Sequence, residues 1–406
     1  MEWENPRDGS LRCLFLSLFP LIFVVFGISS ARAANVPTVR VMVEREKLGV
    51  RVEGFDLIFS DPETGKTFLH EPKRVSIAVK CTLGGVMKIG PRGLKVSGPV
   101  KVESLGGFVR VESGRPAQGD GRQYRDALYL YSFNGDCIVV NHVDLEKYVA
   151  GLLDSEMNAR WNFEALKAQA VAARTYALFQ MKEGSSPRFR GLRPPFDLDS
   201  TEKDQVYEGA HKERYRALRA VEETRGQVLA YQGHPIKAFY HSTCGGHTES
   251  PERVWGAHYP YMKPVRCGFC ESSPRFNWSS DLRSAALEAS LRKAGLLAGR
   301  LRSIRVLQRN RGRVERVEIR GDGGRGGKSV RYATGARLRE LAGTALVRST
   351  DFTVSRSSDK IVFVGHGSGH GVGMCQWGAK VMGERGNTYA QILARYYPEA
   401  GLTRMY

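Results

Sequence analysis

The sequence predicts an α+β protein, with a β-rich N-terminal region followed by a mixed α/β core that contains a buried central helix and several strands. Short alternating runs broken by glycine and proline, such as Val39–Val43, Val109–Val111 and Leu128–Tyr131, are typical of strands joined by turns. From Phe163 to Met181, apolar residues recur three or four positions apart, which is the repeat of one helix face.

The change of pattern along the chain predicts its division into parts. We expect a leader at residues 1–33, a β-rich region at 34–135 and a core domain at 136–406. Within the core domain, residues 184–195 are rich in Gly, Ser, Pro and Arg and are expected to form a loop. Residues 300–330 are expected to be a basic, strand-rich part.

The central helix is expected to be buried on most of its circumference. Between Ala165 and Phe179 the only charged residues are Lys167 and Arg174, so few positions require contact with water. Asn162 is placed to cap the N-terminus of this helix. Further along the chain we expect one more helix and two strands, at residues 208–224, 228–231 and 236–240.

Residues 1–33 have the pattern of a secretory signal peptide. Arg7 and Arg12 precede a charge-free, largely apolar run from Leu14 to Phe26, and small residues flank Arg32 at the end of the segment. Because the run is shorter than the roughly 20 residues that span a bilayer, an uncleaved N-terminal anchor is the alternative to cleavage. In both cases we expect an exported protein of the cell envelope, on the periplasmic or cell-wall side of the membrane.

The charge of the chain indicates a polyanionic partner. The 406 residues contain 61 Lys and Arg against 42 Asp and Glu, a formal net charge of +19, which attracts polyanions. An exported protein meets anionic envelope polymers, so we expect no nucleic acid among its partners. The arginine-rich stretch from Arg292 to Arg331 is by default a solvated face, and its functional alternative is a patch for polyanionic strands.

Cysteines and histidines in the second half of the chain have the spacing of a metal site. A Cys-x-x-His pair, Cys244 and His247, is followed about twenty residues later by the Cys-x-x-Cys pair Cys267 and Cys270. Because Zn²⁺ takes four such ligands, we predict a structural zinc site made of these three cysteines and either His247 or His241. The alternative is a disulfide within these cysteines, which export would permit.

A carboxylate at the entrance of the central helix is a candidate general acid. Glu156 stands just before the helix and close to Trp161, which could form the floor of a sugar site. Partial burial raises the pKa of such a carboxyl group toward neutrality. The alternative is that Glu156 only interacts with the helix dipole or caps the helix.

A run of glycines near the C-terminus is predicted to form part of a ligand cleft. Every second residue from Gly365 to Gly373 is glycine, and His366 and His370 lie between them. Glycine is needed where the backbone approaches another group closely or where φ is positive. The two histidines could bind a metal, move protons or hydrogen-bond a sugar, and a generic Gly/His turn is the alternative.

Together these segments resemble the stage II sporulation protein D family, the SpoIID/LytB domain. The resemblance covers about 270 residues and is loose in the N-terminal region. The matching motifs, in chain order, are Val139–Asn141, Leu145–Tyr148, Ser155–Met157, Glu164–Ala177, His241–Gly246, Val254–Gly256, Ser273–Pro274 and the Gly/His run that ends at Ala379.

The resemblance implies a peptidoglycan lytic transglycosylase that cleaves glycan strands lacking stem peptides to 1,6-anhydromuramic products. It implies that Glu156 is the catalytic acid, and that zinc binds near the His241–Gly246 segment with a ligand set that differs between members. The family's other name, amidase enhancer, implies instead a non-catalytic wall-binding protein. The expected partners are therefore glycan strands and, in the second case, an amidase or other wall hydrolase.

The resemblance also implies a mechanism with a single glutamate, because the 6-hydroxyl group of muramic acid can replace water as the nucleophile. Residues expected to orient Glu156 or hold the glycan are Arg174, Tyr176, His366, His370 and Gln376. Asp154, Asp197 and Asp199 are the carboxylates that would argue against a one-acid mechanism. Cys375 stands where serine often occurs in the family, and we expect a free thiol or a further disulfide partner there.

Overall fold

A computed structural model describes residues 35–406 except 48, 114–120, 184–194 and 324–326. The expected signal peptide and almost all of the expected loop at 184–195 lie outside the described residues. Within the described ranges, no helix is both long enough and apolar enough to cross a membrane. The fold class predicted from the sequence is confirmed, because a β-rich N-terminal part precedes a core of mixed helices and strands.

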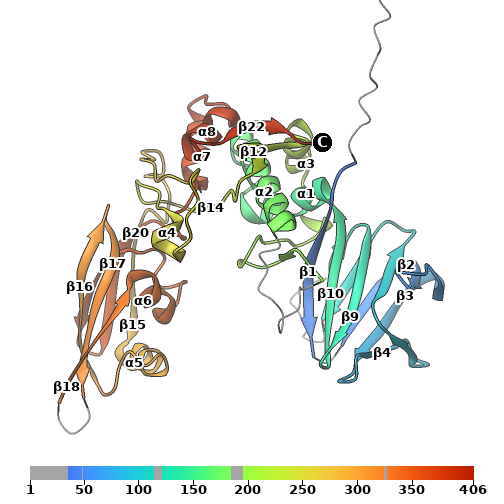
Figure 1. Cartoon of the computed structure of the whole chain (residues 1–406), viewed down its shortest axis with the longest axis horizontal. Helices are drawn as coiled ribbons and strands as arrows, with labels where there is room; N and C mark the ends of the chain where they lie inside the picture. Colours follow the sequence, from blue (N-terminus) through green and yellow to red (C-terminus); the bar gives the residue numbers. More distant parts are fainter. Residues whose placement is uncertain (1–34, 48, 114–120, 184–194, 324–326) are drawn as a thin grey trace, which may run out of the picture. The chain divides into compact units, whose positions relative to one another are not determined.

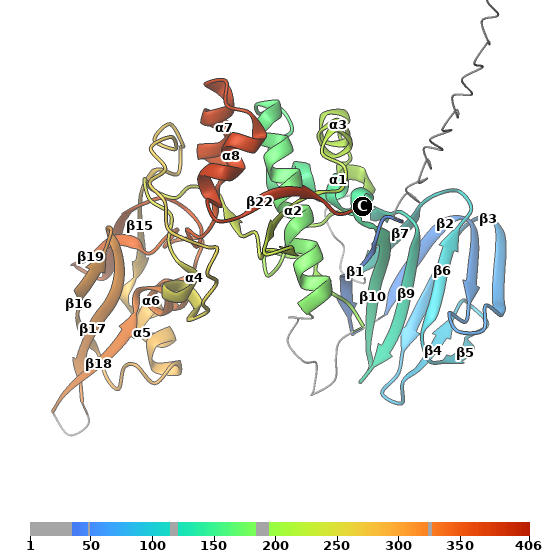
Figure 2. The ribbon, with the colours of Figure 1, turned by 45° about the horizontal axis from the view of Figure 1, so that its top comes forward.

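The N-terminal part is one large sheet (Figures 1 and 2). Its order is β11-β1-β10-β9-β6-β2-β3-β4-β5, and β7 pairs with β2 and with β8. In β1, Val39, Val41 and Val43 are buried while the residues between them are more exposed, which is the alternation expected of a strand with one face on a core. The strands are β1 Thr38–Glu46, β2 Val50–Ser60, β3 Thr67–Cys81, β4 Val86–Ile89, β5 Leu94–Ser97, β6 Val100–Ser104, β7 Val109–Ser113, β8 Arg122–Tyr124, β9 Ala127–Phe133, β10 Asp136–Asp144 and β11 Leu198–Asp199.

Strand β10 leads directly into the first helix, α1 (Leu145–Glu156). Asp144 ends the strand and caps the helix, because its carboxylate accepts hydrogen bonds from the backbone N–H groups of Glu146 and Lys147. A disulfide between Cys81 and Cys137 ties β3 to the start of β10. The expected boundary between residues 135 and 136 falls between the paired strands β9 and β10 of this sheet.

The central helix of the core is α2 (Phe163–Glu183), which is buried along most of its length. Asn162 accepts a hydrogen bond from the backbone N–H of Glu164, as expected of a capping residue. The elements in contact with α2 include α1, α3 (Tyr215–Glu223), β12 (Gln227–Tyr231), α7 (Gln376–Glu384) and α8 (Tyr389–Tyr396). Its one buried charge is Arg174, which pairs with Glu146 of α1 at 2.6 Å.

Short strands connect the core to the C-terminal segments. The pair β14 and β21 is parallel, and β12 lies between β13 and β22. The strand expected at residues 236–240 is wrong for residues 236–239, and only Tyr240 lies in a strand. The backbone turns before it through hydrogen bonds from Ala238 N–H to Ile236 and from Phe239 N–H to Lys237. The remaining core elements are η1 Ala210–Lys212, β13 His234–Pro235, β14 Tyr240–His241, α4 Pro251–Trp255, β21 Met374–Cys375 and β22 Gly401–Arg404.

The residues between the Cys-x-x-Cys pair and the Gly/His run have a hydrophobic core of their own. Two three-stranded sheets, β15-β20-β19 and β16-β17-β18, surround it together with two helices. The expected basic strand-rich part at 300–330 is formed mainly by β16 and β17. The elements are β15 Asn277–Arg283, α5 Ser284–Lys293, β16 Leu301–Asn310, β17 Arg313–Asp322, β18 Lys328–Thr334, α6 Gly335–Ala342, β19 Asp351–Ser357 and β20 Lys360–His366.

Removal of one partner of the ion pair between Arg174 and Glu146 is expected to destabilise the core strongly. The Arg174 side chain is completely buried, so Arg174→Leu leaves the Glu146 carboxylate buried without a counter-charge. We expect a loss of about 3–5 kcal/mol in the free energy of unfolding, measured by urea titration. The control is Arg219→Leu, which removes an exposed pair with Glu223 and should cost about 1 kcal/mol or less. Equal losses in the two variants would contradict this assignment.

Candidate active site

Glu156 is the last residue of α1, and its side chain is partly buried. Its Oε1 accepts a hydrogen bond of 2.7 Å from the backbone N–H of Val206, and the Tyr240 hydroxyl also hydrogen-bonds to the carboxyl group. Burial raises the pKa of Glu156 to about 7, although both hydrogen bonds oppose the shift. The group can therefore hold a proton near neutral pH and release it, which a general acid requires.

Tyr240 belongs to a buried hydrogen-bond network. Its hydroxyl accepts a hydrogen bond of 3.0 Å from Nε2 of Gln205. The Tyr148 hydroxyl donates to Oε1 of the same Gln205 at 3.0 Å. Because each of these polar groups has a partner, the network fixes the Tyr240 hydroxyl where it contacts Glu156.

Gln376, the first residue of α7, holds the backbone at Glu156. Its Nε2 donates to the Glu156 carbonyl oxygen at 2.9 Å and lies 3.4 Å from Oε1 of Gln169 in α2. Gln376 is buried. Its contact therefore ties the start of α7 to the end of α1.

The Gly/His run lies against the segment that contains His241 and Cys244. Thr243 and Ser368 exchange backbone hydrogen bonds of 3.0 and 2.7 Å. Gly373 has a φ of 70°, and a Cβ atom there would lie 1.9 Å from the Phe239 carbonyl oxygen. Glycine is required at this position, because both the left-handed backbone and the close approach exclude a side chain.

The histidines of the run have different surroundings. His370 Nε2 donates to the Tyr240 carbonyl oxygen at 2.9 Å, and its Nδ1 accepts from the Val372 N–H at 3.1 Å. Burial lowers the pKa of His370 to about 4, so the ring is neutral at neutral pH. His366 is exposed and pairs with Asn277 at 2.8 Å. The structure thus links His370 to Glu156 through Tyr240, and it gives His366 no such link.

Arg174 and Tyr176 both lie on α2, but only the Tyr176 side chain lines a pocket that a ligand could enter. Arg174 has no exposed surface and is committed to Glu146, so we leave it out of the proposed site. Tyr176 donates a hydrogen bond of 2.9 Å to Oδ1 of Asp204. Both Tyr176 and Asp204 line a pocket of about 560 Å³.

This pocket has aromatic walls, and two of its lining residues are close in sequence to the hydrogen-bond partners of Glu156. Glu156 is not itself one of its lining residues. However, the wall residue Asp204 comes two positions before Val206, whose N–H group binds Glu156. The wall residue Phe239 directly precedes Tyr240. The aromatic side chains of the wall are Tyr176, Phe196, Phe239, Trp255 and Tyr259.

The three carboxylates that would argue against a one-acid mechanism already have partners. Asp154 accepts a hydrogen bond of 2.9 Å from the Ala159 N–H group. Asp199 accepts one of 3.0 Å from the Thr201 N–H group. The third, Asp197, is buried and pairs with Arg40. These contacts give each carboxylate a structural role.

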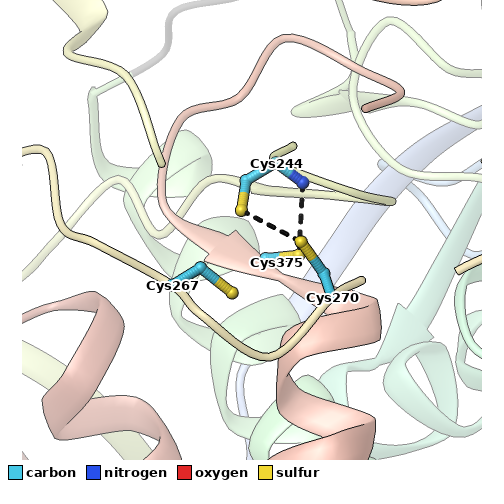
Figure 3. A group of neighbouring side chains, drawn as sticks. All are labelled: Cys244, Cys267, Cys270 and Cys375. Carbon is cyan, nitrogen blue, oxygen red and sulfur yellow. Dashed lines mark hydrogen bonds between the residues drawn. The ribbon is translucent and has the colours of Figure 1, made fainter. Parts of the chain in front are cut away.

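Four buried cysteines form a cluster with the composition of a metal site (Figure 3). Their sulfur atoms all lie within 4.8 Å of one another, and Cys244 and Cys270 are 3.5 Å apart. Four thiolates at about 2.3 Å from a tetrahedral ion would be about 3.8 Å apart. The cluster members are Cys244, Cys267, Cys270 and Cys375.

The fourth member of the cluster is Cys375, and neither of the expected histidines, His247 and His241, belongs to the cluster. His241 instead contacts the Val372 carbonyl oxygen through Nδ1 at 3.0 Å. Cys375 comes from β21, and its sulfur accepts hydrogen bonds from the N–H groups of Cys244 and Gly378. In the sequence, the only indication for Cys375 was that it is a fourth cysteine, next to the Gly/His run. It lies more than 100 residues after Cys244, Cys267 and Cys270.

Comparisons with known proteins agree with this arrangement of motifs. The family model described as Stage II sporulation protein matches residues 133–231. The chain is 32% identical over 272 residues to the Stage II sporulation protein D of Bacillus amyloliquefaciens, an alignment that covers 64% of this chain and 74% of that protein. The chain belongs to the stage II sporulation protein D family.

Two other relatives of this SpoIID family member have less specific or different names. An uncharacterized protein of Brachyspira hyodysenteriae is 36% identical over 279 residues, which is 68% of this chain and 72% of the relative. The amidase enhancer of Bacillus subtilis is 30% identical over 297 residues, which is 62% of this chain and 40% of the enhancer. The family resemblance stated from the motifs is confirmed.

The raised pKa of Glu156 predicts a pH-dependent stability. The folded protein binds this proton more tightly than the unfolded chain, so the stabilisation is complete below a pH of about 4.3 and is lost as the pH rises through about 7. Glu156→Gln cannot ionise and keeps an acceptor for Val206. By calorimetry, we expect it to raise the Tm relative to wild type at about pH 8 but not at about pH 4.

The control for this measurement is Glu222→Gln, which changes a carboxylate that is 71% exposed. Its Tm difference from wild type should be the same at both pH values. A similar pH-independent difference for Glu156→Gln would contradict the assignment of a raised pKa to Glu156.

Proposed function

We propose that this chain is an exported lytic transglycosylase that cleaves peptidoglycan glycan strands, preferably strands without stem peptides, to 1,6-anhydromuramic products. The observation that carries the proposal is the environment of Glu156, a partly buried carboxyl group with a pKa of about 7 that Val206 and Tyr240 hold in place. A cell-wall role is also supported by membership of the SpoIID family and by the relative named amidase enhancer.

In the proposed reaction, Glu156 serves both proton transfers. The protonated carboxyl group donates its proton to the glycosidic oxygen as the bond from that oxygen to C1 of muramic acid breaks and an oxocarbenium-like centre develops. The resulting carboxylate accepts the proton of the 6-hydroxyl group of the same sugar, and that oxygen bonds to C1. No water is consumed, and the starting protonation state of Glu156 is restored.

The occupied carboxylates support a one-acid mechanism. Hydrolysis by a glycosidase uses a second carboxylate as base or nucleophile. The nearby candidates Asp154, Asp197 and Asp199 each accept hydrogen bonds or pair with a basic side chain. Their contacts favour closure by the sugar's own hydroxyl group over attack by an activated water.

The second candidate function is binding to the wall and enhancement of an amidase. It is favoured by the 30% identity to the amidase enhancer of Bacillus subtilis. In this case the purified protein would release no sugar product by itself and would increase the rate of a partner amidase. The partners of this chain are then glycan strands and the amidase.

We further propose that the cysteine cluster holds a structural Zn²⁺ ion. Four thiolates complete a tetrahedral site and leave no position for a substrate or a reactive water. The chemistry that the ion supplies is therefore cross-linking, since it would join the segments that carry Cys244, Cys267 and Cys375. An ion at this place would hold the Gly/His run against the rest of the core.

The test of the enzyme proposal is product analysis on denuded glycan strands. Glu156→Gln should reduce the release of anhydromuramic products by at least about 100-fold while binding to insoluble glycan stays intact, both followed by mass spectrometry and pelleting. The control Asp154→Asn should keep wild-type product release. Anhydro products formed at the wild-type rate by Glu156→Gln would overturn the proposal, and their absence with the wild-type protein would favour the amidase-enhancer function.

The zinc proposal predicts the metal content of the protein. Reduced, purified protein should contain about one Zn²⁺ per chain by elemental analysis. Cys375→Ser should lose most of this zinc in a competition with a chelator that leaves wild type loaded, because one of four thiolates is missing. His247→Ala should retain it. Equal loss from both variants, or stable disulfides among the four cysteines after purification under reducing conditions, would contradict a four-thiolate zinc site.

A further inference from the structure

Lys237 places a positive charge in the aromatic pocket described above. It follows β13, lines the pocket and is half-buried. Its Nζ atom lies 5.6 Å from the ring centre of Phe179 and 5.4 Å from that of Phe239. The backbone at Lys237 is held by a hydrogen bond of 3.1 Å from its N–H group to the Tyr261 hydroxyl. The Lys237 ammonium group is therefore held close to the aromatic rings of Phe179 and Phe239.

The acidic side chains of the pocket are already engaged elsewhere. Asp204 accepts hydrogen bonds of 2.9 Å from Tyr176, Gln180 and the Asp199 N–H group. The Asp199 carboxylate bonds to Thr201. The lining carboxylates therefore make their short contacts with other groups, although the charge of Asp204 still acts on Lys237 at longer range.

The other cations of the pocket have carboxylate partners. Arg45 pairs with Asp136 at 2.8 Å, and Lys203 pairs with Asp199 at 3.6 Å. Within the described part of the chain, no carboxylate lies within ion-pair distance of Nζ of Lys237. Burial lowers the pKa of Lys237, which reflects the cost of holding this charge without a close counter-ion.

A half-buried cation beside aromatic rings fits a sugar that carries a carboxylate. Aromatic side chains bind the apolar face of a sugar ring, and an ammonium group binds a carboxylate through charge-assisted hydrogen bonds. Muramic acid has such a group on its lactyl side chain. In intact peptidoglycan the lactyl carboxyl is an amide that begins the stem peptide and is neutral. Removal of the stem peptide by hydrolysis of that amide leaves a free carboxylate.

We propose that Lys237 binds the lactyl carboxylate of a muramic acid residue and thereby selects glycan strands from which the stem peptides have been removed. This inference rests on the function proposed above and assigns its substrate preference to one residue. The amide of an intact strand cannot form the ion pair, so Lys237 would discriminate by charge in addition to any steric exclusion of the peptide.

The test is a binding measurement in the Glu156→Gln background, which prevents consumption of the ligand. Isothermal titration compares three oligosaccharides of equal length: a stem-peptide-free muramic acid oligomer, the same oligomer with its lactyl carboxyls converted to methylamides, and a chitooligosaccharide. Adding Lys237→Met should weaken binding of the first ligand by about tenfold to 100-fold. It should leave binding of the other two unchanged, because neither carries the carboxylate.

Two further variants serve as controls. Lys203→Met removes a pocket cation whose side chain is 80% exposed and paired with Asp199, and it should weaken binding of the carboxylate ligand by less than about threefold. Lys237→Arg keeps the charge and should retain most of the affinity. An unchanged Tm in Lys237→Met would show that the loss of binding is not a loss of fold.

The outcomes separate this inference from the proposed function. Equal affinity of Lys237→Met and its parent for the carboxylate ligand would overturn the role of Lys237, even if wild type releases anhydro products. Equal weakening for all three ligands would also overturn it, because the effect would not depend on the carboxylate. Selective loss of carboxylate binding would support it, even if wild type proves to be a binding protein without catalytic activity.

Discussion

Tyr240 connects the segments from which the candidate site is built. Its hydroxyl group contacts the Glu156 carboxyl at the end of α1, and its carbonyl oxygen accepts the hydrogen bond from His370 in the Gly/His run. Its strand, β14, pairs with β21. One residue thus joins elements that are more than 80 and more than 120 positions away in the sequence. Displacement of β14 would change the environment of the acid and of the histidine together.

Burial is the physical cause of the unusual titration properties around this residue. Removal from water disfavours charge, so it raises the pKa of Glu156 and lowers that of His370. The His370 ring is therefore neutral at neutral pH, and a large fraction of the Glu156 carboxyl groups carries a proton at about pH 7. The same burial strengthens each hydrogen bond that forms in the site as charge develops.

The sequence contains enough local information to predict the helix and strand pattern, and much less about partners that are distant in the chain. The central helix was expected over residues 163–181 and spans Phe163–Glu183, since its spacing and cap are local features. Glu156 could be selected because it lies only seven positions before the start of that helix. By contrast, Cys375 was not placed with Cys244, because contacts between distant segments bring them together, including the pairing of β14 with β21 and the bridge between Thr243 and Ser368.

The charged residues show the same limit. Arg174 was one of the residues expected to orient Glu156 or hold the glycan. Its partner Glu146 lies on another helix, 28 positions away, and the pattern of α2 alone cannot reveal that pairing. Lys237 lay in a segment expected to be a strand. That expectation did not indicate that its side chain lines a pocket. The irregular backbone there depends on contacts with the C-terminal residues, including the Tyr397 hydroxyl at the Phe239 carbonyl oxygen.

Cys375 and Gln376 are consecutive, yet their side chains serve different parts of the core. The first joins the sulfur cluster, and the second holds the backbone carbonyl of Glu156. A small rotation of the backbone at the start of α7 would therefore move both the Cys375 sulfur and the Gln376 amide group. Because the two residues share this turn of the backbone, substitutions at them should not have additive effects on the stability of the protein.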